Sequence, residues 1–241
     1  MSQKPPPKQF VKTSINGTKH TLLVSSAKGG VGKSTVTVNL AFALQNLDLK
    51  IGILDADVYG PSLPKLMKIN EKPKNDDGKA ITPVTKYGAQ CMSMGLLVDE
   101  LTPMIWRGPM VISAIKTMTQ KVLWKDRDII IIDMPPGTGD AYLTIFKELE
   151  VDHFILINTN NVLSSADSSR TISMLKKLNV NILGYIENNI FNADKRPANF
   201  FEINKINKLA SYSFHDRILN FDPEFNCEES NDVAKKIYEM T

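Results

Sequence analysis

The chain has 241 residues, 42% of them hydrophobic and 23% charged, which suits one large α/β domain with a sizeable core. Its formal net charge is only +3 and its lysines are scattered, so charge indicates neither a nucleic acid nor an acidic membrane as a partner. No stretch approaches the roughly 20 apolar residues that a membrane-spanning helix needs. The two cysteines, Cys91 and Cys227, make no disulfide framework and fit a reducing compartment.

The amino-terminal segment is polar and basic, with three consecutive prolines and no apolar signal core. We predict a flexible tail over residues 1–19, followed by a single domain over residues 20–241. Mitochondrial presequences share the basic character, but this segment contains no arginine. A cytoplasmic location is therefore predicted, with the mitochondrial matrix as the alternative.

Short apolar runs alternate along the chain with segments of helical periodicity, which is typical of a parallel sheet covered by helices. Strands are predicted at residues 20–26, 50–57, 91–95, 128–134, 153–159 and 181–188. Helices are predicted at residues 36–47, 111–122, 140–149 and 163–178. Turn-forming residues at 75–78 predict a surface excursion, and the segment after residue 190 predicts a short helix at 200–210, one more strand and a helix at 231–239. The predicted fold is one doubly wound α/β domain with a mostly parallel sheet.

A glycine-rich segment, KGGVGKST (28–35), follows the first predicted strand and opens the first predicted helix. This is the context of a phosphate-binding loop, in which glycines let the backbone N–H groups and the helix N-terminus face phosphate oxygens. Lys33 is expected to reach the terminal phosphates, and the Ser34 hydroxyl to ligate Mg²⁺. The predicted nucleotide-binding residues of this loop are Lys28, Gly29, Gly30, Val31, Gly32, Lys33, Ser34 and Thr35.

The strict loop pattern G-x-x-x-x-G-K-[ST] is not met, because Ala27 stands where its first glycine should be. The segment matches instead the variant with a second lysine, Lys28, ahead of the glycine pair. A glycine-rich turn without a ligand is the alternative interpretation. Eight residues that agree in type, order and context favour the nucleotide site.

Acidic residues end two of the predicted strands. Asp133 follows a run of four isoleucines, the place of a carboxylate that holds Mg²⁺ through water, and Gly137 is expected to offer its N–H to the γ-phosphate. Asp55 and Asp57 lie two residues apart, which places them on one face of a strand. One is expected beside the metal and the other beside the attacking water. The alternatives are a strand-end cap for Asp133 and a turn residue for Asp57.

Together these segments resemble the Mrp (ApbC) family of iron–sulfur carrier ATPases, relatives of MinD and ParA with a deviant phosphate loop. The matching segments run from about residue 20 to 188: SSAKGGVGKSTVTVNLA, ILDADVYGPSLPKLM, CMSMGLLV, WRGPMV, IIIDMPPGTGD and ILGYIEN. CMSMG and WRGPM are most similar to the branch that contains the mitochondrial complex I assembly factor. The resemblance implies slow Mg²⁺-dependent ATP hydrolysis by a homodimer, and a role in iron–sulfur cluster assembly or transfer to apoproteins. It also implies that Lys28 contacts phosphate in the partner subunit and that Asn188 hydrogen-bonds adenine.

The chain departs from this family at the segment that would bind a cluster. Mrp proteins usually carry a C-P-x-C pair after E-N-M-S, whereas the corresponding stretch here, ENNIFNADKRPANFFE, contains no cysteine. A [4Fe–4S] cluster needs thiolate ligands, so the sequence predicts ATP and Mg²⁺ as cofactors and leaves binding of a cluster open. Cys91 is expected in the core and Cys227 at the surface, and a cluster held by two copies of Cys227 is a weak alternative.

Two other functions stay open for this reason. One is a cluster-free, nucleotide-dependent scaffold; the other is a ParA-like positioning ATPase acting on DNA, against which the Mrp-specific segments argue.

The three histidines, His20, His153 and His215, do not have the spacing of metal ligands and are expected at strand edges or on the surface.

Overall fold

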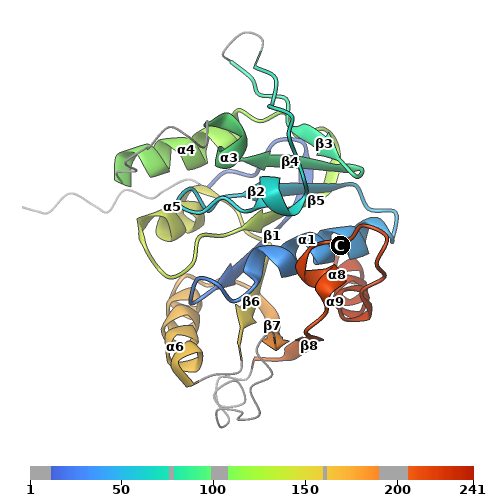
Figure 1. The fold of residues 1–241 in the computed structure, drawn as a ribbon. Helices are drawn as coiled ribbons and strands as arrows, with labels where there is room; N and C mark the ends of the chain where they lie inside the picture. The colour runs from blue at the N-terminus through green and yellow to red at the C-terminus, as the bar shows by residue number, and fades with distance from the viewer. Residues whose placement is uncertain (1–11, 76–78, 99–107, 160–161, 190–205) are drawn as a thin grey trace, which may run out of the picture.

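An eight-stranded sheet with helices on both faces forms the molecule (Figure 1). The structure is a computed structural model that describes residues 12–75, 79–98, 108–159, 162–189 and 206–241. The strand order is β3-β4-β2-β5-β1-β6-β7-β8, and every neighbouring pair is parallel except β3 and β4. The predicted doubly wound, mostly parallel α/β fold is confirmed.

The strands have these bounds: β1 Thr18–Ser26, β2 Ile51–Asp55, β3 Val84–Lys86, β4 Ala89–Ser93, β5 Arg127–Asp133, β6 His153–Asn158, β7 Ile182–Asn189 and β8 Lys208–Ser213. The helices are α1 Lys33–Gln45, α2 Leu63–Leu66, α3 Met94–Leu97, α4 Gly108–Gln120, α5 Asp140–Glu148, α6 Val162–Lys177, α8 Asp216–Leu219 and α9 Glu228–Tyr238. Within the described ranges, no helix has both the length and the apolar character to cross a membrane.

The central strands are apolar on both faces, and alternate residues supply two separate cores. In β5, Ile129 and Ile131 belong to the core that also contains apolar residues of α1 and α9, whereas Ile130 and Ile132 belong to the core that contains apolar residues of α4 and α5. This period-2 division is the geometry of a strand covered by helices on both sides. Figure 1 shows the same two layers, with α1, α8 and α9 on one face and α4, α5 and α6 on the other.

The packed structure begins before residue 20, so the predicted boundary between the tail and the domain is wrong. The Thr13 N–H donates to the Glu148 carbonyl at 2.9 Å, and Ile15 is fully buried. Gly17 has φ +80°, and a Cβ there would lie 1.6 Å from the carbonyl oxygen of Trp124, so only glycine fits this turn. Residues 12–19 therefore belong to the packed structure, while residues 1–11 lie outside the described residues.

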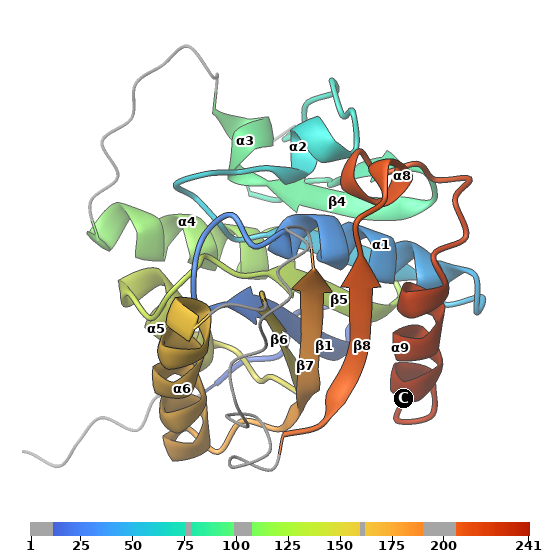
Figure 2. The ribbon, with the colours of Figure 1, turned by 60° about the horizontal axis from the view of Figure 1, so that its bottom comes forward.

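The prediction of a short helix at residues 200–210 is wrong for residues 206–210, the part of that range that the structure describes. Residues 200–205 lie outside the described part of the chain, and Lys208 begins the edge strand β8. β8 pairs in parallel with β7, as Figure 2 shows, and this pairing overrides the local pattern. The terminal helix is present as α9, and the excursion predicted at 75–78 is flanked by an antiparallel bridge between Lys74 and Thr82.

Candidate functional site: a phosphate loop beside buried carboxylates

The glycine-rich loop joins β1 to α1 at the carboxyl edge of the sheet. Gly30 and Gly32 have φ +75° and +79°, in the left-handed region that favours glycine. Gly32 is the N-cap of α1 and provides no side-chain cap for the first N–H groups of the helix. A helix N-terminus with uncapped N–H groups is an anion-binding feature. The local geometry therefore agrees with the phosphate loop that the sequence predicts.

A buried ion pair lies directly below the start of α1. The Lys33 Nζ is 2.5 Å from Asp133 Oδ1, and the two residues are 7% and 1% exposed. Thr37, one turn along α1, donates from its hydroxyl to the same oxygen at 3.3 Å. The Lys33 ammonium also lies 3.4 Å from the Ser34 hydroxyl. The structure thus brings together three of the residues predicted to hold phosphate and metal.

The second carboxylate oxygen of Asp133 has a different environment. Asp133 Oδ2 is buried and has no hydrogen-bond partner among the described residues. A buried acceptor without a donor is destabilising unless a further group binds there. Oxygen ligands are those that Mg²⁺ prefers, usually with several of its waters retained. The oxygens of Asp133 and Ser34 therefore fit a magnesium site.

Asp55 has a structural position that the sequence did not indicate. It is fully buried and accepts hydrogen bonds from the N–H groups of Asp57, Ser62 and Leu63 and from the Ser93 hydroxyl, at 3.0–3.2 Å. Burial, and next the negative charge of Asp133, raise the pKa of Asp55 to about 7. This carboxyl group joins β2, the following loop and β4, and it has no free face toward the cavity described next.

Asp57 is the carboxylate that borders open space. It lines a cavity of about 330 Å³ together with Tyr59, Gly60, Pro135, Pro136, Gly139, Ala141 and Tyr142. The Gly60 N–H donates to Asp57 Oδ1 at 3.2 Å and fixes the carboxylate, and burial raises its pKa above the ordinary value. Of the two candidates for orienting water, Asp57 has the access and Asp55 does not.

Three further predicted residues have intramolecular partners in this structure. Lys28 Nζ lies 3.5 Å from Asp167 Oδ2 of α6, and both side chains are partly exposed. The Gly137 N–H donates to the Ser26 carbonyl at 3.1 Å, so an interaction with a γ-phosphate requires that this bond open. The Asn188 amide nitrogen donates to the Val31 carbonyl at 2.8 Å, which joins the end of β7 to the phosphate loop.

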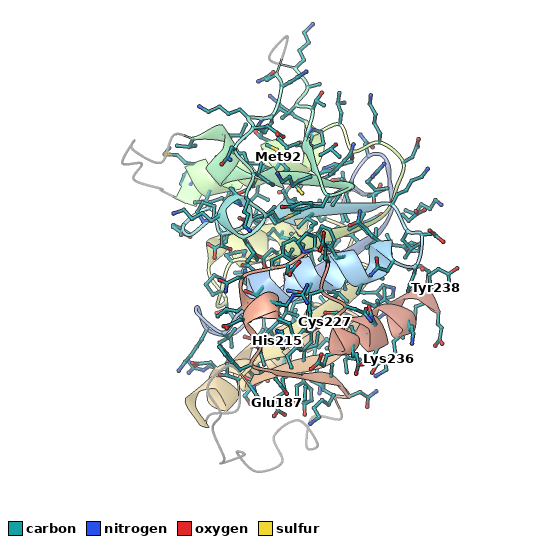
Figure 3. The ribbon with its side chains drawn as sticks, turned by 45° about the vertical axis from the view of Figure 1, so that its right-hand side comes forward. Met92, Glu187, His215, Cys227, Lys236 and Tyr238 are labelled. Atoms are coloured by element: carbon teal, nitrogen blue, oxygen red, sulfur yellow. The ribbon has the colours of Figure 1, made fainter. Side chains whose placement is uncertain are left out.

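Both cysteines are buried. Cys91 in β4 is fully buried, as expected, and burial raises the pKa of its thiol to about 12. The prediction of a surface thiol at Cys227 is wrong: it is 5% exposed, because α9 packs against α1, and Figure 3 shows it between these two helices. Burial also raises the pKa of Cys227. Over the described ranges, no three His, Cys, Asp or Glu side chains form a group able to hold a metal ion.

Sequence reasoning missed three residues of this site. Thr37 stands one helical turn after Lys33, a spacing that offered a signal. Ser93 and Asp167 gave no local signal, because their partners Asp55 and Lys28 come from distant parts of the chain.

Comparison with known proteins decides the family. The family model described as "ParA: NUBPL iron-transfer P-loop NTPase" matches residues 17–240. The chain belongs to this family. The iron–sulfur protein required for NADH dehydrogenase, mitochondrial, of Arabidopsis thaliana is 51% identical over 175 residues, which are 72% of this chain and 56% of that protein. The iron–sulfur cluster carrier protein of Helicobacter pylori is 41% identical over 218 residues, or 88% of this chain and 59% of the carrier.

The mouse iron–sulfur cluster transfer protein NUBPL is 36% identical over 228 residues, 92% of this chain and 72% of the mouse protein. The chain thus spans less than three fifths of the length of the Arabidopsis and Helicobacter relatives. Among solved structures, the nucleotide-binding protein of Archaeoglobus fulgidus in complex with ADP has a TM-score of 0.70 at 27% identity, covering 93% of this chain and 90% of that one. MinD of Pyrococcus furiosus shares the fold, with a TM-score of 0.69 at 18% identity over 92% and 99% of the two chains.

Proposed function

We propose that this protein is a Mg²⁺-dependent ATPase of low turnover that acts as a homodimer in iron–sulfur cluster assembly or transfer to target apoproteins. The observation that carries the proposal is the buried Lys33–Asp133 pair beneath an uncapped, glycine-rich helix start. The names of the iron–sulfur carrier and transfer relatives supply the cellular process. Relatives come from bacteria and, for the Arabidopsis protein, from mitochondria, so the cytoplasm and the mitochondrial matrix both stay predictions.

Binding of the nucleotide exchanges the partners of the buried pair. In this structure Asp133 is the ionic partner of the Lys33 ammonium, and both residues are buried. A bound triphosphate would offer Lys33 a second anionic partner, and Asp133 and the Ser34 hydroxyl would then be the residues that hold Mg²⁺. Bound Mg²⁺ would neutralise charge on the phosphates. The remaining loop residues, from Gly29 to Thr35, present backbone N–H groups to the phosphate oxygens.

Hydrolysis requires a water that is aligned with the terminal phosphate. Asp57 is suited to orient that water, because its fixed carboxylate borders the 330 Å³ cavity and its raised pKa brings its basicity closer to neutral pH. Asp55 supports this role indirectly, since it accepts the Asp57 N–H at 3.1 Å. Such a switch uses hydrolysis for timing, which fits a low turnover.

Lys28 is proposed to act across the dimer interface. In the single chain Lys28 is paired with Asp167 at 3.5 Å, with its side chain 37% exposed, so the pair is weak enough to exchange. In the ATP-bound dimer the lysine contacts phosphate in the partner subunit, and Gly137 and Asn188 complete the contacts to the γ-phosphate and the adenine.

The proposal is tested by phosphate release and by mass measurement in solution. Wild type should release phosphate slowly from ATP with Mg²⁺ and form a dimer with a non-hydrolysed ATP analogue. Lys28→Ala should remain monomeric with the analogue while still binding it. If wild type neither binds ATP nor dimerises with it, the proposal fails.

A second candidate, the cluster-free scaffold, is favoured by one observation. A four-thiolate cluster bridging a dimer needs accessible thiolates, but Cys91 and Cys227 are both buried with raised pKa values. The residues of this chain therefore do not fit a [4Fe–4S] cluster as its ligands. Iron and sulfide analysis after anaerobic reconstitution decides between the two: about one cluster per dimer supports a carrier, and no bound iron supports a scaffold.

A further inference from the structure

A buried serine at the end of β4 lies beside the loop that carries Asp57. Ser93 is fully buried, and it is the Cα partner of Asp55 in the parallel pairing of β4 with β2. Its hydroxyl donates to Asp55 Oδ2 at 3.0 Å. The same hydroxyl oxygen accepts the Gly95 N–H at 3.1 Å at the start of α3, which fixes its orientation. The single O–H of Ser93 is therefore directed at the Asp55 carboxylate.

The Asp55 carboxylate holds both ends of this loop. The Asp57 N–H donates to Oδ1 at 3.1 Å, and the N–H groups of Ser62 and Leu63 donate to Oδ2 at 3.1 and 3.2 Å. These three donors belong to the loop or to the first residue of α2, so they can move together with it. Among the described residues, Ser93 is the hydrogen-bond donor that reaches Asp55 from another strand. The Ser93 hydroxyl therefore fixes the carboxylate, and with it the loop, against the sheet.

Close packing joins α3 to the same loop. A Cβ at Gly95 would lie 3.1 Å from side-chain carbons of Pro61 and 3.3 Å from the Pro64 side chain, so α3 approaches the loop and α2 closely because this residue is glycine. Figure 2 shows α2 and α3 next to each other beyond the end of β4. The strand order places β4 on the side of β2 that is opposite to β5 and β1. The segment from Ser93 into α3 thus supports the Asp57 loop from the side away from the phosphate loop.

We propose that Ser93 is a positioning residue for ATP hydrolysis, which holds Asp57 in place through Asp55, an inference that rests on the proposed ATPase function. Ser93 is buried and is not among the residues that line the cavity at Asp57. Its effect is therefore on the direction of the Asp57 carboxylate, which matters for aligning the water and not for binding ATP. A displacement of about 1 Å in an aligned group can lower a rate about 100-fold.

Phosphate release and titration calorimetry with the full chain test this role. Ser93→Ala should lower the rate of phosphate release at saturating Mg²⁺–ATP about tenfold and leave the affinity for ATP within about twofold of wild type. Ser93→Thr keeps the hydroxyl and should retain most of the wild-type rate. Gly95→Ala keeps Ser93 but places a Cβ against Pro61, and it should also lower the rate without weakening the binding of ATP.

Ser230→Ala is the matched control. Ser230 is also fully buried, and its hydroxyl lies 2.6 Å from the hydroxyl of Tyr212 in β8, at the opposite edge of the sheet from β4. This variant should lower the urea midpoint, as Ser93→Ala does, but release phosphate at the wild-type rate.

The inference is refuted if Ser93→Ala releases phosphate as fast as wild type, or if it loses rate and ATP affinity to the same degree. Should circular dichroism show that Ser93→Ala is unfolded, a wild-type rate in Gly95→Ala refutes it instead. A wild type that neither binds ATP nor releases phosphate is a different result, because the proposed ATPase function then fails and the role of Ser93 fails with it.

Discussion

Breaking the buried ion pair of the phosphate site should destabilise the protein strongly, because it leaves one charge buried without a partner, and Lys33→Met tests this expectation. Methionine keeps most of the apolar stem of Lys33 but removes the ammonium that lies 2.5 Å from Asp133 Oδ1. Asp133 is 1% exposed, and among the described residues the Thr37 hydroxyl, at 3.3 Å, would then be the remaining hydrogen-bond donor to that oxygen. Breaking a buried pair costs about 3–5 kcal/mol, and we expect about 3 kcal/mol because Thr37 remains.

Urea unfolding followed by circular dichroism measures this loss. Lys33→Met should lower the free energy of unfolding by about 3 kcal/mol, which corresponds to roughly 10 °C in Tm for a chain of this length. Asp133→Asn should also be destabilising, because it leaves the ammonium buried. The double variant should lose at least about 2 kcal/mol less than the sum of the single variants, since neither charge is then left alone.

An exposed pair of the same kind is the matched control. Lys19 Nζ lies 2.7 Å from Asp128 Oδ1, but its side chain is 72% exposed. Lys19→Met should therefore shift the urea midpoint much less than Lys33→Met does. Equal shifts for Lys33→Met and for this surface control would refute the reasoning, because burial would then make no difference.

Three further predictions concern the neighbouring groups. The pKa of Asp55 is raised to about 7 from 3.8, so the stability that its protonation contributes is fully present below about pH 4 and is lost as the pH rises through 7. Asp55→Asn should flatten this part of the pH profile of the urea midpoint. An unchanged slope would contradict the assignment. Asp57→Asn should lower phosphate release at least about 100-fold while ATP affinity by calorimetry changes little, and equal losses of both would mean that Asp57 serves binding. Cys227→Ala should cost about 1 kcal/mol in urea unfolding and leave the iron content after reconstitution unchanged, whereas loss of bound iron would restore Cys227 as a cluster ligand.

The sheet and the phosphate loop can be predicted from the sequence because both depend on local patterns. Four consecutive isoleucines predict a strand buried on both faces, and β5 contributes two of them to each core. The glycines of the loop predict left-handed backbone, and Gly30 and Gly32 have it. Asp133 was found because it ends a buried strand, where parallel topology gathers functional groups.

The remaining features depend on contacts between distant segments, which a single sequence does not reveal. Asp55 looked equivalent to Asp57, but the pairing of β2 with β4 brings the Ser93 hydroxyl to Asp55 and closes its access to the cavity. Cys227 looked exposed among polar neighbours, but the packing of α9 on α1 buries it. The stretch at Lys208 looked helical, and only the free edge of β7 makes it a strand.

The most direct test of the account is the release of phosphate from ATP by the full chain, measured with Mg²⁺ and with the metal chelated, in wild type and in Asp133→Asn. The account predicts slow release that requires Mg²⁺ and that falls at least about 100-fold in the variant. Release that persists without Mg²⁺, or that is the same in Asp133→Asn, would contradict the assignment of Lys33, Ser34 and Asp133 as the phosphate and metal site.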